Sequence, residues 1–475
     1  MLFYKPADAW AADFIPFYHG GLYYLYYLHD WRDIEGHGEG TPWYLITTPD
    51  FVHFTEHGEM LARGPLGSQD LFVFTGSVIE AEGRFHIFYT GHNHHLQEQG
   101  LPAQCVMRAV SDDLLRWSKC TGEMHFAPAD GFEPHDWRDP FVFRNEDAGE
   151  YWMLLAARIP GGPSRRRGCT ALCASSDLVN WEVRDPLYAP GTYYTHECPD
   201  LFRIGDWWYL LFSEFTDSSQ TRYRMARSLA GPWIAPANDA FDARSLYAAK
   251  TASDGERRFL FGWNPTRTPE SDRDGNWNWG GNLAVHEIVQ AADGTLAVRV
   301  PDTVDRAFSA GALPVRFVPG LGSCEAQAGG VLADARNGCA CAIAGAMPAA
   351  CRIETTVTFE PGTRACGVML RVSDDLEKAY YLRLEPDRHR LVFDLWPRGG
   401  DVPFAPGMER PLTLRAGESV TLKVLVEGTV CEVYAADQVA LSLRFYDHRA
   451  GSWGVFAQDG TARFTGTQFS GPPAR

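Results

Sequence analysis

Short runs of alternating apolar and polar residues recur along the chain, and Gly, Asp or Pro bounds most of them. Three examples, rich in aromatic and β-branched side chains, are residues 21–27, 84–89 and 207–212. Alternation with period two over a few residues is typical of a β-strand with one buried face. Long helical periodicity is hard to find anywhere in the sequence. The pattern therefore predicts an all-β protein.

One element repeats in the first part of the chain. The form Asp-apolar-x-x-aromatic occurs at residues 50–54, 113–117 and 177–181, each time after a Thr or Ser, and residues 228–233 are a degenerate fourth copy. The first three copies lie roughly 63 residues apart, a period expected of propeller blades with long loops. Each blade buries its faces only against its neighbours, so the ring has to close. We therefore expect a β-propeller over residues 1–300.

The character of the sequence changes after Pro301. A Gly/Ala/Cys-rich stretch precedes further runs with period-two alternation, at residues 352–359, 380–385 and 421–426. We expect a linker and the start of a β-sandwich over 301–350, and a C-terminal β-sandwich over 351–475. Its expected role is structural, as a cap on the propeller or as the contact of a homodimer. Carbohydrate binding is the alternative.

Size and charge narrow the class of protein. With 475 residues the chain is too long for one hydrophobic core and fits two domains. Its formal net charge of −17 opposes binding to nucleic acid or to an anionic membrane. No apolar stretch approaches the ~20 residues of a membrane helix, and no export signal is visible. The 11 cysteines, an odd number without CxxC pairs, argue against a zinc site and a disulfide framework. We expect reduced thiols in a cytoplasmic protein, or a secreted protein if a leader has been removed.

Three acidic segments, set far apart, carry the candidate chemistry. They are Trp10-Ala11-Ala12-Asp13, Trp137-Arg138-Asp139-Pro140 and His196-Glu197-Cys198-Pro199-Asp200. Cleavage of a glycosidic bond needs one carboxylate to attack or stabilise the sugar carbon and another to protonate the leaving oxygen. Asp13 and Glu197 are the candidates for these two roles. For any one of the carboxylates taken alone, turn capping is the alternative.

These segments and their neighbours resemble glycoside hydrolase family 32, the invertases, inulinases and levanases. The resemblance is an ordered series over nearly the full chain, which includes Trp10 to Asp13, Phe74-Thr75-Gly76-Ser77, Arg138-Asp139-Pro140, Glu197-Cys198-Pro199-Asp200-Leu201-Phe202, and blocks at 43–51, 247–251, 262–263 and 279–283. The C-terminal part also resembles the sandwich of that family. The resemblance implies a five-bladed propeller with a funnel-shaped pocket at its axis. It also implies Asp13 as nucleophile, Glu197 as acid/base and Asp139 as the transition-state stabiliser that grips sugar hydroxyls.

The implied mechanism retains the configuration at the sugar carbon. In such enzymes the two working carboxyls lie about 5–5.5 Å apart. Asp13 must be ionised to attack, whereas Glu197 must be protonated to donate to the leaving oxygen and then act as base toward water. We expect no cofactor, because this chemistry needs no metal. Cys198 is interpreted as a polar neighbour and not as a nucleophile, since no base pairs with it.

Further residues are candidates for substrate binding. Aromatic faces can bury the apolar side of a sugar ring, so we expect a pocket wall from Trp10, Trp43, Phe74 and Trp279, with Thr75 beside them. Arg138 could neutralise excess negative charge and fix Asp139, or be a structural arginine on a blade loop. The cluster His92-Asn93-His94-His95 shows no carboxylate at ligand spacing, so we expect a loop at the pocket rim and no metal site.

The sequence departs from the family pattern around the sugar. Ala12 stands where the family has Asn before the nucleophile, Leu28 and His29 replace a Gln, and Tyr44-Leu45 replaces Gly-His. A site built to bond hydroxyl groups rejects sugars that lack them, so altered contacts indicate a substrate other than plain sucrose.

Three functions follow from these observations. The first is a retaining β-fructofuranosidase-like hydrolase that acts on a fructoside or a related furanoside oligosaccharide. The second is a transglycosylase on the same scaffold, which passes the glycosyl unit to a sugar hydroxyl. The third is a catalytically silent carbohydrate-binding protein.

Overall fold

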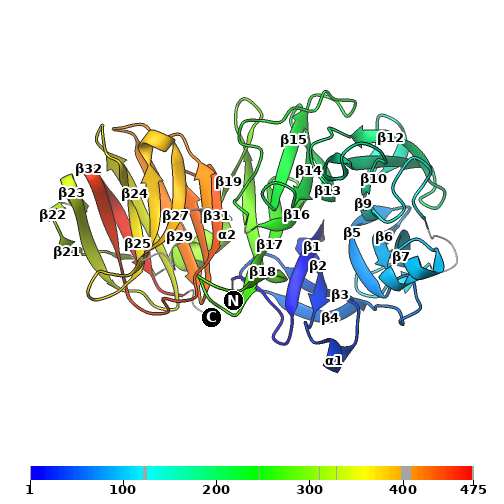
Figure 1. Cartoon of the computed structure of the whole chain (residues 1–475), viewed down its shortest axis with the longest axis horizontal. Helices are drawn as coiled ribbons and strands as arrows, with labels where there is room; N and C mark the ends of the chain where they lie inside the picture. The colour runs from blue at the N-terminus through cyan, green and yellow to red at the C-terminus, as the bar shows by residue number, and fades with distance from the viewer. Residues whose placement is uncertain are drawn as a thin grey trace.

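The fold of the chain is almost entirely β, as the alternation predicted. The computed structural model describes residues 2–120, 126–244, 246–309, 311–327, 329–396 and 408–472. In Figure 1 these residues form two bodies, with the N-terminal strands on one side and the C-terminal strands on the other. The α-helices of the described residues are α1 (Ile34–His37) and α2 (Asp302–Ser309). Neither of these helices is long and apolar enough to cross a membrane.

The N-terminal half consists of four antiparallel sheets. Their strands are β1 (Trp10–His19), β2 (Leu22–Asp30), β3 (Trp43–Thr48), β4 (Thr55–Leu61), β5 (Phe72–Ala81), β6 (Arg84–His92), β7 (Gln104–Ser111), β8 (Ser118–Lys119), β9 (Trp137–Asn145), β10 (Glu150–Arg158), β11 (Gly168–Ser175), β12 (Glu182–Tyr188), β13 (Glu197–Ile204), β14 (Trp207–Glu214), β15 (Gln220–Ala226), β16 (Tyr247–Ser253), β17 (Arg258–Thr268), β18 (Asn276–Gln290) and β19 (Leu296–Arg299). The sheets comprise β5–β8, β9–β12, β13–β15, and a larger one that joins β16–β19 to β1–β4.

The beginning and the end of this half belong to the same sheet. Strand β1 pairs with β18 at a single register position, Ala11 opposite Gly281. Strand β1 also runs beside β5, and β5 beside β9, without hydrogen-bonded pairing between them. The sheets therefore follow one another around a ring, and the β1–β18 contact closes it. This is the architecture of a β-propeller (Figure 1).

The repeated Asp-apolar-x-x-aromatic element forms the same turn in three sheets. In the turn from β7 to β8, the Ser111 hydroxyl accepts hydrogen bonds from the backbone N–H groups of Asp113 and Leu114, at 3.1 and 3.0 Å. The Asp113 carboxylate accepts from the next two N–H groups, and Leu114 has a φ of 65°. Equivalent bonds recur around Asp50 and Asp177. The Ser/Thr and Asp side chains thus build the turns that follow β3, β7 and β11.

Around the ring the antiparallel strands come in successive groups, which begin with β1, β5, β9, β13 and β16. The first strand of each group is irregular where it meets the centre of the ring. Pairing shifts register within β1, β5, β9, β13 and β16, or opposite them in the neighbouring strand. Four residues at these positions have φ between 44° and 60°, namely Asp13, Asp139, Cys198 and Ala248. A β-bulge leaves a residue unpaired and redirects its side chain, and bulges are common beside active sites. These strands therefore aim single side chains toward the axis.

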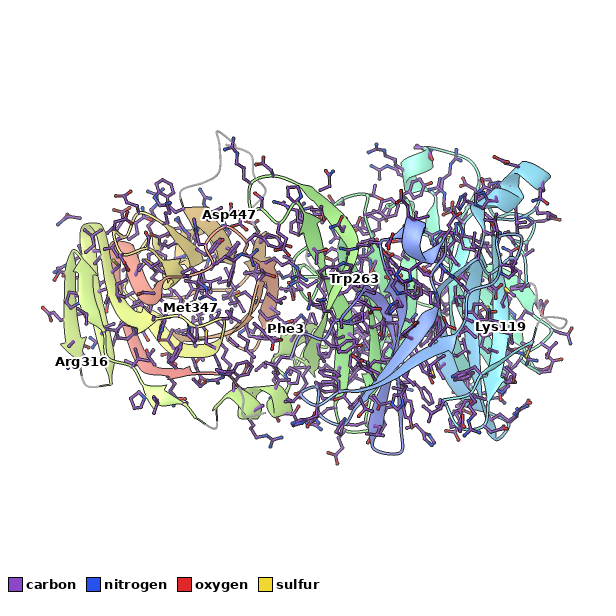
Figure 2. All side chains as sticks on the ribbon, turned by 90° about the horizontal axis from the view of Figure 1, so that it is seen from below. Phe3, Lys119, Trp263, Arg316, Met347 and Asp447 are labelled. Atoms are coloured by element: carbon purple, nitrogen blue, oxygen red, sulfur yellow. The ribbon has the colours of Figure 1, made fainter. Side chains whose placement is uncertain are left out.

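The C-terminal half is a β-sandwich built on one long strand. Its strands are β20 (Leu313–Pro314), β21 (Val318–Leu321), β22 (Ser323–Gln327), β23 (Gly330–Ala346), β24 (Ala350–Phe359), β25 (Ala365–Val372), β26 (Ala379–Glu385), β27 (Arg390–Trp396), β28 (Met408–Pro411), β29 (Ser419–Glu427), β30 (Val430–Ala435), β31 (Val439–Arg444) and β32 (Ser452–Ser470). The first part of β32 pairs with β25, the last part pairs with β24, and β23 pairs along both parts. Met347 lies inside this half in Figure 2 and belongs to its buried core. The segment 301–350 contains α2 and strands β20–β23, of which β20 and β23 pair with β32.

The two halves share a buried core. Phe3, which lies between them in Figure 2, packs in one apolar cluster with Leu425 and Tyr434 of the sandwich. A buried polar network crosses the same boundary: Asp242 accepts a hydrogen bond of 2.9 Å from His286, and one of 2.7 Å from Ser442 of the sandwich. The sandwich is therefore fixed to the propeller by both apolar packing and buried hydrogen bonds.

Candidate active site

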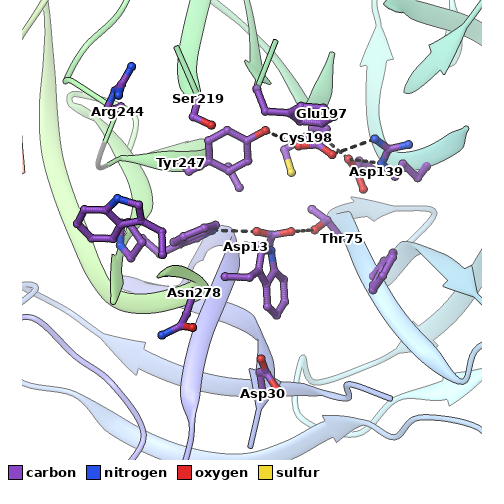
Figure 3. A pocket seen from close by; sticks show the side chains of 18 of the residues that line it. Asp13, Asp30, Thr75, Asp139, Glu197, Cys198, Ser219, Arg244, Tyr247 and Asn278 are labelled. Atoms are coloured by element: carbon purple, nitrogen blue, oxygen red, sulfur yellow. Dashed lines mark hydrogen bonds and ion pairs between the residues drawn. The ribbon is translucent and has the colours of Figure 1, made fainter. Parts of the chain in front are cut away.

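A pocket of about 830 Å³ opens at the centre of the propeller. Asp13 from β1, Asp139 from β9 and Glu197 from β13 all line it, and Figure 3 shows their carboxylates facing the same space. Each comes from the irregular part of a first strand. The three acidic segments identified in the sequence thus meet in one place, although the chain separates them by many residues.

Asp13 is held by two donors from other strands. The Thr75 hydroxyl donates to its Oδ2 at 2.6 Å, and the Trp263 indole N–H donates to its Oδ1 at 2.9 Å (Figure 3). Burial raises the pKa of Asp13 to about 7, an effect that these hydrogen bonds offset in part and that nearby Asp139 and Glu197 increase. Near neutral pH the carboxyl is thus poised between its two protonation states, with both oxygens fixed in direction.

Asp139 is bonded mainly through backbone groups. The N–H of Cys198 donates to its Oδ2 at 2.9 Å, and the backbone N–H of Asp139 itself donates to Thr90 at 2.7 Å. Burial raises the pKa of Asp139, while the Arg138 guanidinium, whose Nε lies 3.8 Å from Oδ2, opposes that rise. One carboxylate oxygen is therefore used for positioning, and the side chain lies against the pocket.

Glu197 receives one donor at each oxygen. Arg138 donates from Nη2 to Oε1 at 2.9 Å, and the Tyr247 hydroxyl donates to Oε2 (Figure 3). Arg138 also donates to Asp136 at 2.7 Å. Although burial lowers it, Glu197 and Asp139 together hold the pKa of Arg138 above its usual range, so the guanidinium stays charged. Of the two roles considered for Arg138, contact with Asp139 is limited to the ion pair at 3.8 Å, whereas its shorter hydrogen bonds reach Glu197 and Asp136.

Two family models match the chain. Residues 4–298 match the model described as the glycosyl hydrolases family 32 N-terminal domain, and residues 334–470 match that of the family 32 C terminal. The chain belongs to glycosyl hydrolases family 32. The resemblance inferred from the ordered motifs is thereby confirmed.

Individual members of family 32 are similar to this chain at low identity. Raffinose invertase of Escherichia coli is 28% identical over 311 residues, which cover 59% of this chain and 60% of that protein. Sucrose-6-phosphate hydrolase of Vibrio alginolyticus is 26% identical over 301 residues, which cover 59% and 58%. The chain thus spans about three-fifths of the length of these curated relatives.

Solved structures of family 32 share the fold over nearly the whole chain. Fructan 1-exohydrolase IIa from Cichorium intybus superposes with a TM-score of 0.75 at 15% identity, over 99% of this chain and 96% of that one. Sucrose-6-phosphate hydrolase from Lactobacillus gasseri superposes with a TM-score of 0.71 at 19% identity, over 99% and 92%. These likenesses support the propeller and the sandwich.

The aromatic wall of this family 32 pocket differs from the expected set. Phe74 and Trp279 line it, as predicted, together with Thr75. Trp43 does not: it is fully buried between β3 and neighbouring strands, where its indole N–H donates to the carbonyl of Val73 at 3.1 Å. Trp10 lies under the Arg32 guanidinium, 4.5 Å from its ring, and is not part of the lining. The other aromatic residues of the lining are Phe72, Phe215, Tyr247, Trp263 and Trp277.

The residues at which the sequence departs from family 32 turn away from the pocket. Ala12 is fully buried beside Asp13. His29 is also buried, stacks on Tyr44 with ring centroids 3.9 Å apart, and has its pKa lowered to about 4 by burial. Asp30, Thr41 and Asn278 line the pocket instead, so polar groups for sugar hydroxyls come from other positions.

Several residues that position the carboxylates were missed as functional residues. Tyr247 and Trp263 fall in blocks that resemble family 32, yet nothing in those blocks indicates that they bond Glu197 and Asp13. Burial raises the pKa of the Cys198 thiol well above its usual value, which fits a role for this residue through its backbone N–H only. The only signal for these residues was their place in the ordered series.

The histidine loop differs from expectation in one respect. The sequence shows no carboxylate at ligand spacing, but the fold brings one to the loop: Glu39, between β2 and β3, lies 3.2 Å from His94 and 3.0 Å from His95. The loop does lie close to the pocket wall, because the ring of His94 is 6.0 Å from that of Phe72.

Proposed function

We propose that the protein is a retaining glycosidase of the β-fructofuranosidase type, which hydrolyses a fructoside or a related furanoside oligosaccharide. Asp13 is the nucleophile, Glu197 the acid/base and Asp139 the stabiliser of the transition state. One observation carries the proposal: three carboxylates from three irregular strands converge on one pocket, and each has a different set of hydrogen-bond donors. Two carboxyls in different environments are what acid and nucleophile roles require.

In the first step, ionised Asp13 attacks the anomeric carbon and Glu197 gives its proton to the leaving oxygen. A covalent glycosyl-enzyme forms and the bond to the leaving group breaks. The donors from Thr75 and Trp263 fix the direction of the attacking carboxylate, which reduces the entropy that the reaction must otherwise lose. The raised pKa of Asp13 keeps it a stronger base, and hence a stronger nucleophile, than a solvated aspartate.

The donors of Glu197 indicate which oxygen carries the proton. Arg138 has no acceptor atom, so Oε1 accepts from it in both protonation states of Glu197. A tyrosine hydroxyl can donate or accept, so Tyr247 can accept from a protonated Oε2 and donate to the ionised one. The proton is therefore held on Oε2. In the second step, the same oxygen takes a proton from the water that releases the sugar.

The number of blades, the domain bounds and the oligomeric state are also part of this proposal. The repeated irregularity in β1, β5, β9, β13 and β16 supports five blades, each of which contributes its first strand to the axis. On this assignment the propeller covers residues 1–300, and the sandwich follows from the segment 301–350. A homodimer contact through the sandwich stays a prediction, which analytical ultracentrifugation would test.

The lining also suggests where the rest of the substrate binds. Phe74 and Trp279 offer faces for sugar rings, while Thr75 and Arg138 are committed to the carboxylates. A second arginine of the lining, Arg244, has no hydrogen-bond or ion-pair partner among the described residues. Because relatives include hydrolases of raffinose and of sucrose 6-phosphate, a neutral and a phosphorylated fructoside both belong in the test.

The test is hydrolysis of a substrate panel by the purified protein. The panel holds sucrose, sucrose 6-phosphate, raffinose, oligosaccharides of the inulin and levan types, and aryl furanosides of fructose and arabinose. Asp13→Asn and Glu197→Gln are the inactive variants, and Asp206→Asn, on an exposed ion pair, is the matched control. Sugar release that persists in the control and falls by more than about 10³-fold in both variants supports the proposal.

Product analysis separates the remaining functions. With methanol as acceptor, a retaining enzyme gives the methyl furanoside with the configuration of the substrate. Transfer of the sugar to a second substrate molecule in preference to water would identify a transglycosylase. Binding without turnover of any panel member would contradict the proposal and identify a binding protein.

A further inference from the structure

Three side chains with metal-ligating atoms lie together outside the catalytic carboxylates. They are Glu39 in the loop between β2 and β3, and His94 and His95 at the start of the 3₁₀ turn between β6 and β7. Their ligand atoms all lie within 4.8 Å of one another, and in the part of the chain that the structure describes no other group of this kind occurs. The chain brings them together across 55 residues of sequence, which is why their spacing shows no metal motif.

The ligand atoms lie close enough to converge on one ion, with each ring nearest a different oxygen of Glu39. The Nε2 atom of His94 lies 3.2 Å from Oε1 of Glu39, and the Nε2 atom of His95 lies 3.0 Å from Oε2. Ligand atoms bound at about 2.0–2.1 Å in a tetrahedral zinc site lie roughly 3.3 Å apart. The two rings are 4.0 Å apart and inclined by 40°, so both nitrogens face the same carboxylate.

Both segments are held in place before any ion arrives. Arg63 donates from Nη1 to the backbone carbonyls of Glu39 and Gly40, each at 2.8 Å, which fixes the loop that carries the carboxylate. On the other side, buried Asn93 accepts from the N–H of His95 at 3.0 Å and donates to the carbonyls of Leu66 and Ser68. A site with positioned ligands loses little conformational entropy when it binds an ion.

We propose that Glu39, His94 and His95 bind one divalent transition-metal ion of the zinc class. Two imidazoles and one carboxylate are a donor set that suits Zn²⁺, and Ni²⁺ and Cu²⁺ also prefer imidazole. The side chains are 27%, 48% and 42% exposed, so the ion can enter from solvent and the fourth position is filled by water. This site is independent of the proposed hydrolysis, which requires no metal.

An ion and a proton compete for the same ring nitrogens of His94 and His95. Without an ion, each ring nitrogen that faces Glu39 must carry a proton to bond the carboxylate. An ion needs the same nitrogens as unprotonated ligands, so binding displaces these protons. The rings of Phe72 and His92 also lie near His94, at 6.0 and 6.1 Å between ring centroids.

A bound ion would link two loops at the mouth of the pocket. Glu39 belongs to the loop after β2 and the histidines to the loop after β6, and His94 lies against Phe72 of the pocket wall. The expected consequence is mechanical: the two loops move less relative to each other, and the protein unfolds at higher temperature when the ion is present.

The experiment uses the full chain, freed of metal with a chelator and then desalted. Titration with Zn²⁺ at pH 7.5 should give one high-affinity ion per chain, with a rise in Tm at saturation. Co²⁺ at the same site should give the visible absorption of a tetrahedral N/O complex. His94→Ala, His95→Ala and Glu39→Gln should each weaken Zn²⁺ binding at least tenfold. The matched control is His53→Ala, because His53 is an exposed histidine that pairs with Asp50 at 2.8 Å without a third ligand.

Two results would overturn the proposal. One is binding of less than about 0.2 ion per chain at micromolar Zn²⁺. The other is full binding that survives all three substitutions, which would place the ion on other groups, such as the thiols. Each variant is first compared with the wild type in its metal-free Tm and circular dichroism, so a folding defect is recognised as such. Hydrolytic activity is measured separately and decides nothing about this site.

Discussion

Tyr247 and Glu197 are joined by a hydrogen bond between two neighbouring strands of the ring, from the first residue of β16 to the first residue of β13. Arg138 occupies the other oxygen of the same carboxylate. Glu197 therefore has one partner that can only donate and one that can also accept. On the proposed mechanism, this asymmetry assigns the proton to one oxygen and makes Tyr247 a positioning residue for the proposed acid/base.

We predict that Tyr247→Phe lowers kcat/KM by about 10–100-fold, because the acid/base loses the partner that exchanges donor and acceptor roles. The loss should fall mainly on kcat, and the Tm should change by only a few degrees. Tyr24→Phe, in which a half-buried tyrosine of β2 loses its hydroxyl, is the control and should retain activity. An unchanged kcat/KM in Tyr247→Phe would show that the hydrogen bond has no part in the reaction.

The pKa of Asp13 predicts the acid side of the pH profile. Burial raises this pKa to about 7, and Asp13 must be ionised if it is the nucleophile that we propose. The acid limb of the kcat/KM profile should therefore have its midpoint near pH 7. A plateau that begins near pH 4, the range of a solvated aspartate, would contradict the assignment.

The same shift predicts a cost in stability. Between the unfolded pKa near 4 and the folded value near 7, the native state binds more protons than the unfolded state, so stability falls as pH rises through this window. Asp13→Asn removes the ionisation, and its stability should equal that of the wild type near pH 4 and exceed it by about 4 kcal/mol at pH 8. Differential scanning calorimetry of both proteins at the two pH values measures the difference. A variant that is less stable than the wild type at pH 8 would contradict it.

Gly76 is required by the shape of β5. A Cβ atom at this position would lie 1.9 Å from the carbonyl oxygen of Phe88 on the neighbouring strand. Gly76→Ala should therefore destabilise the protein by roughly 3 kcal/mol or more and disturb adjacent Thr75, which bonds the nucleophile. Gly67→Ala, where a Cβ meets nothing within 4 Å, should be nearly neutral. Thermal denaturation and residual activity of the two variants test the contrast.

Asp242 connects the two halves, and every group that its carboxylate bonds is a hydrogen-bond donor. Its carboxylate accepts from His286, from the N–H and hydroxyl of Ser442, and from the N–H of Ala243. Burial alone would raise the pKa of Asp242, but these bonds, led by that from His286, hold it below its usual value. In Asp242→Asn an amide NH₂ must face a donor, so we expect a loss of about 3 kcal/mol. Asp206→Asn, on an exposed pair, should change stability by less than about 0.5 kcal/mol.

The sequence predicted those features that depend on neighbouring residues. The Ser/Thr and Asp pairs of the repeat bond backbone groups within three positions, so their pattern could be recognised directly. The carboxylates of Asp13, Asp139 and Glu197 could be selected because each lies in a distinct local motif. These motifs also occur in a fixed order along the chain. The alternation of apolar and polar residues likewise predicted strands with one buried face.

Features that depend on the side of a strand or on distant partners could not be predicted. Trp43 adjoins a motif that resembles family 32, but alternation alone does not say which face points to the pocket, and this ring faces the core. Trp263 reaches Asp13 from 250 positions away, and Glu39 reaches His95 from 56. No spacing rule within one strand or helix predicts such pairs, because only the closed ring brings these segments of the chain together.

The irregular first strands have a consequence for how such an enzyme changes. The three proposed catalytic carboxylates belong to the strands themselves, whereas groups at the mouth, such as Phe215 and Arg244, lie between strands. Loops tolerate replacement far better than paired strands do. Selection or engineering can therefore replace the residues at the pocket mouth without changing the carboxylates on the strands. One inherited reaction centre can then serve different sugars.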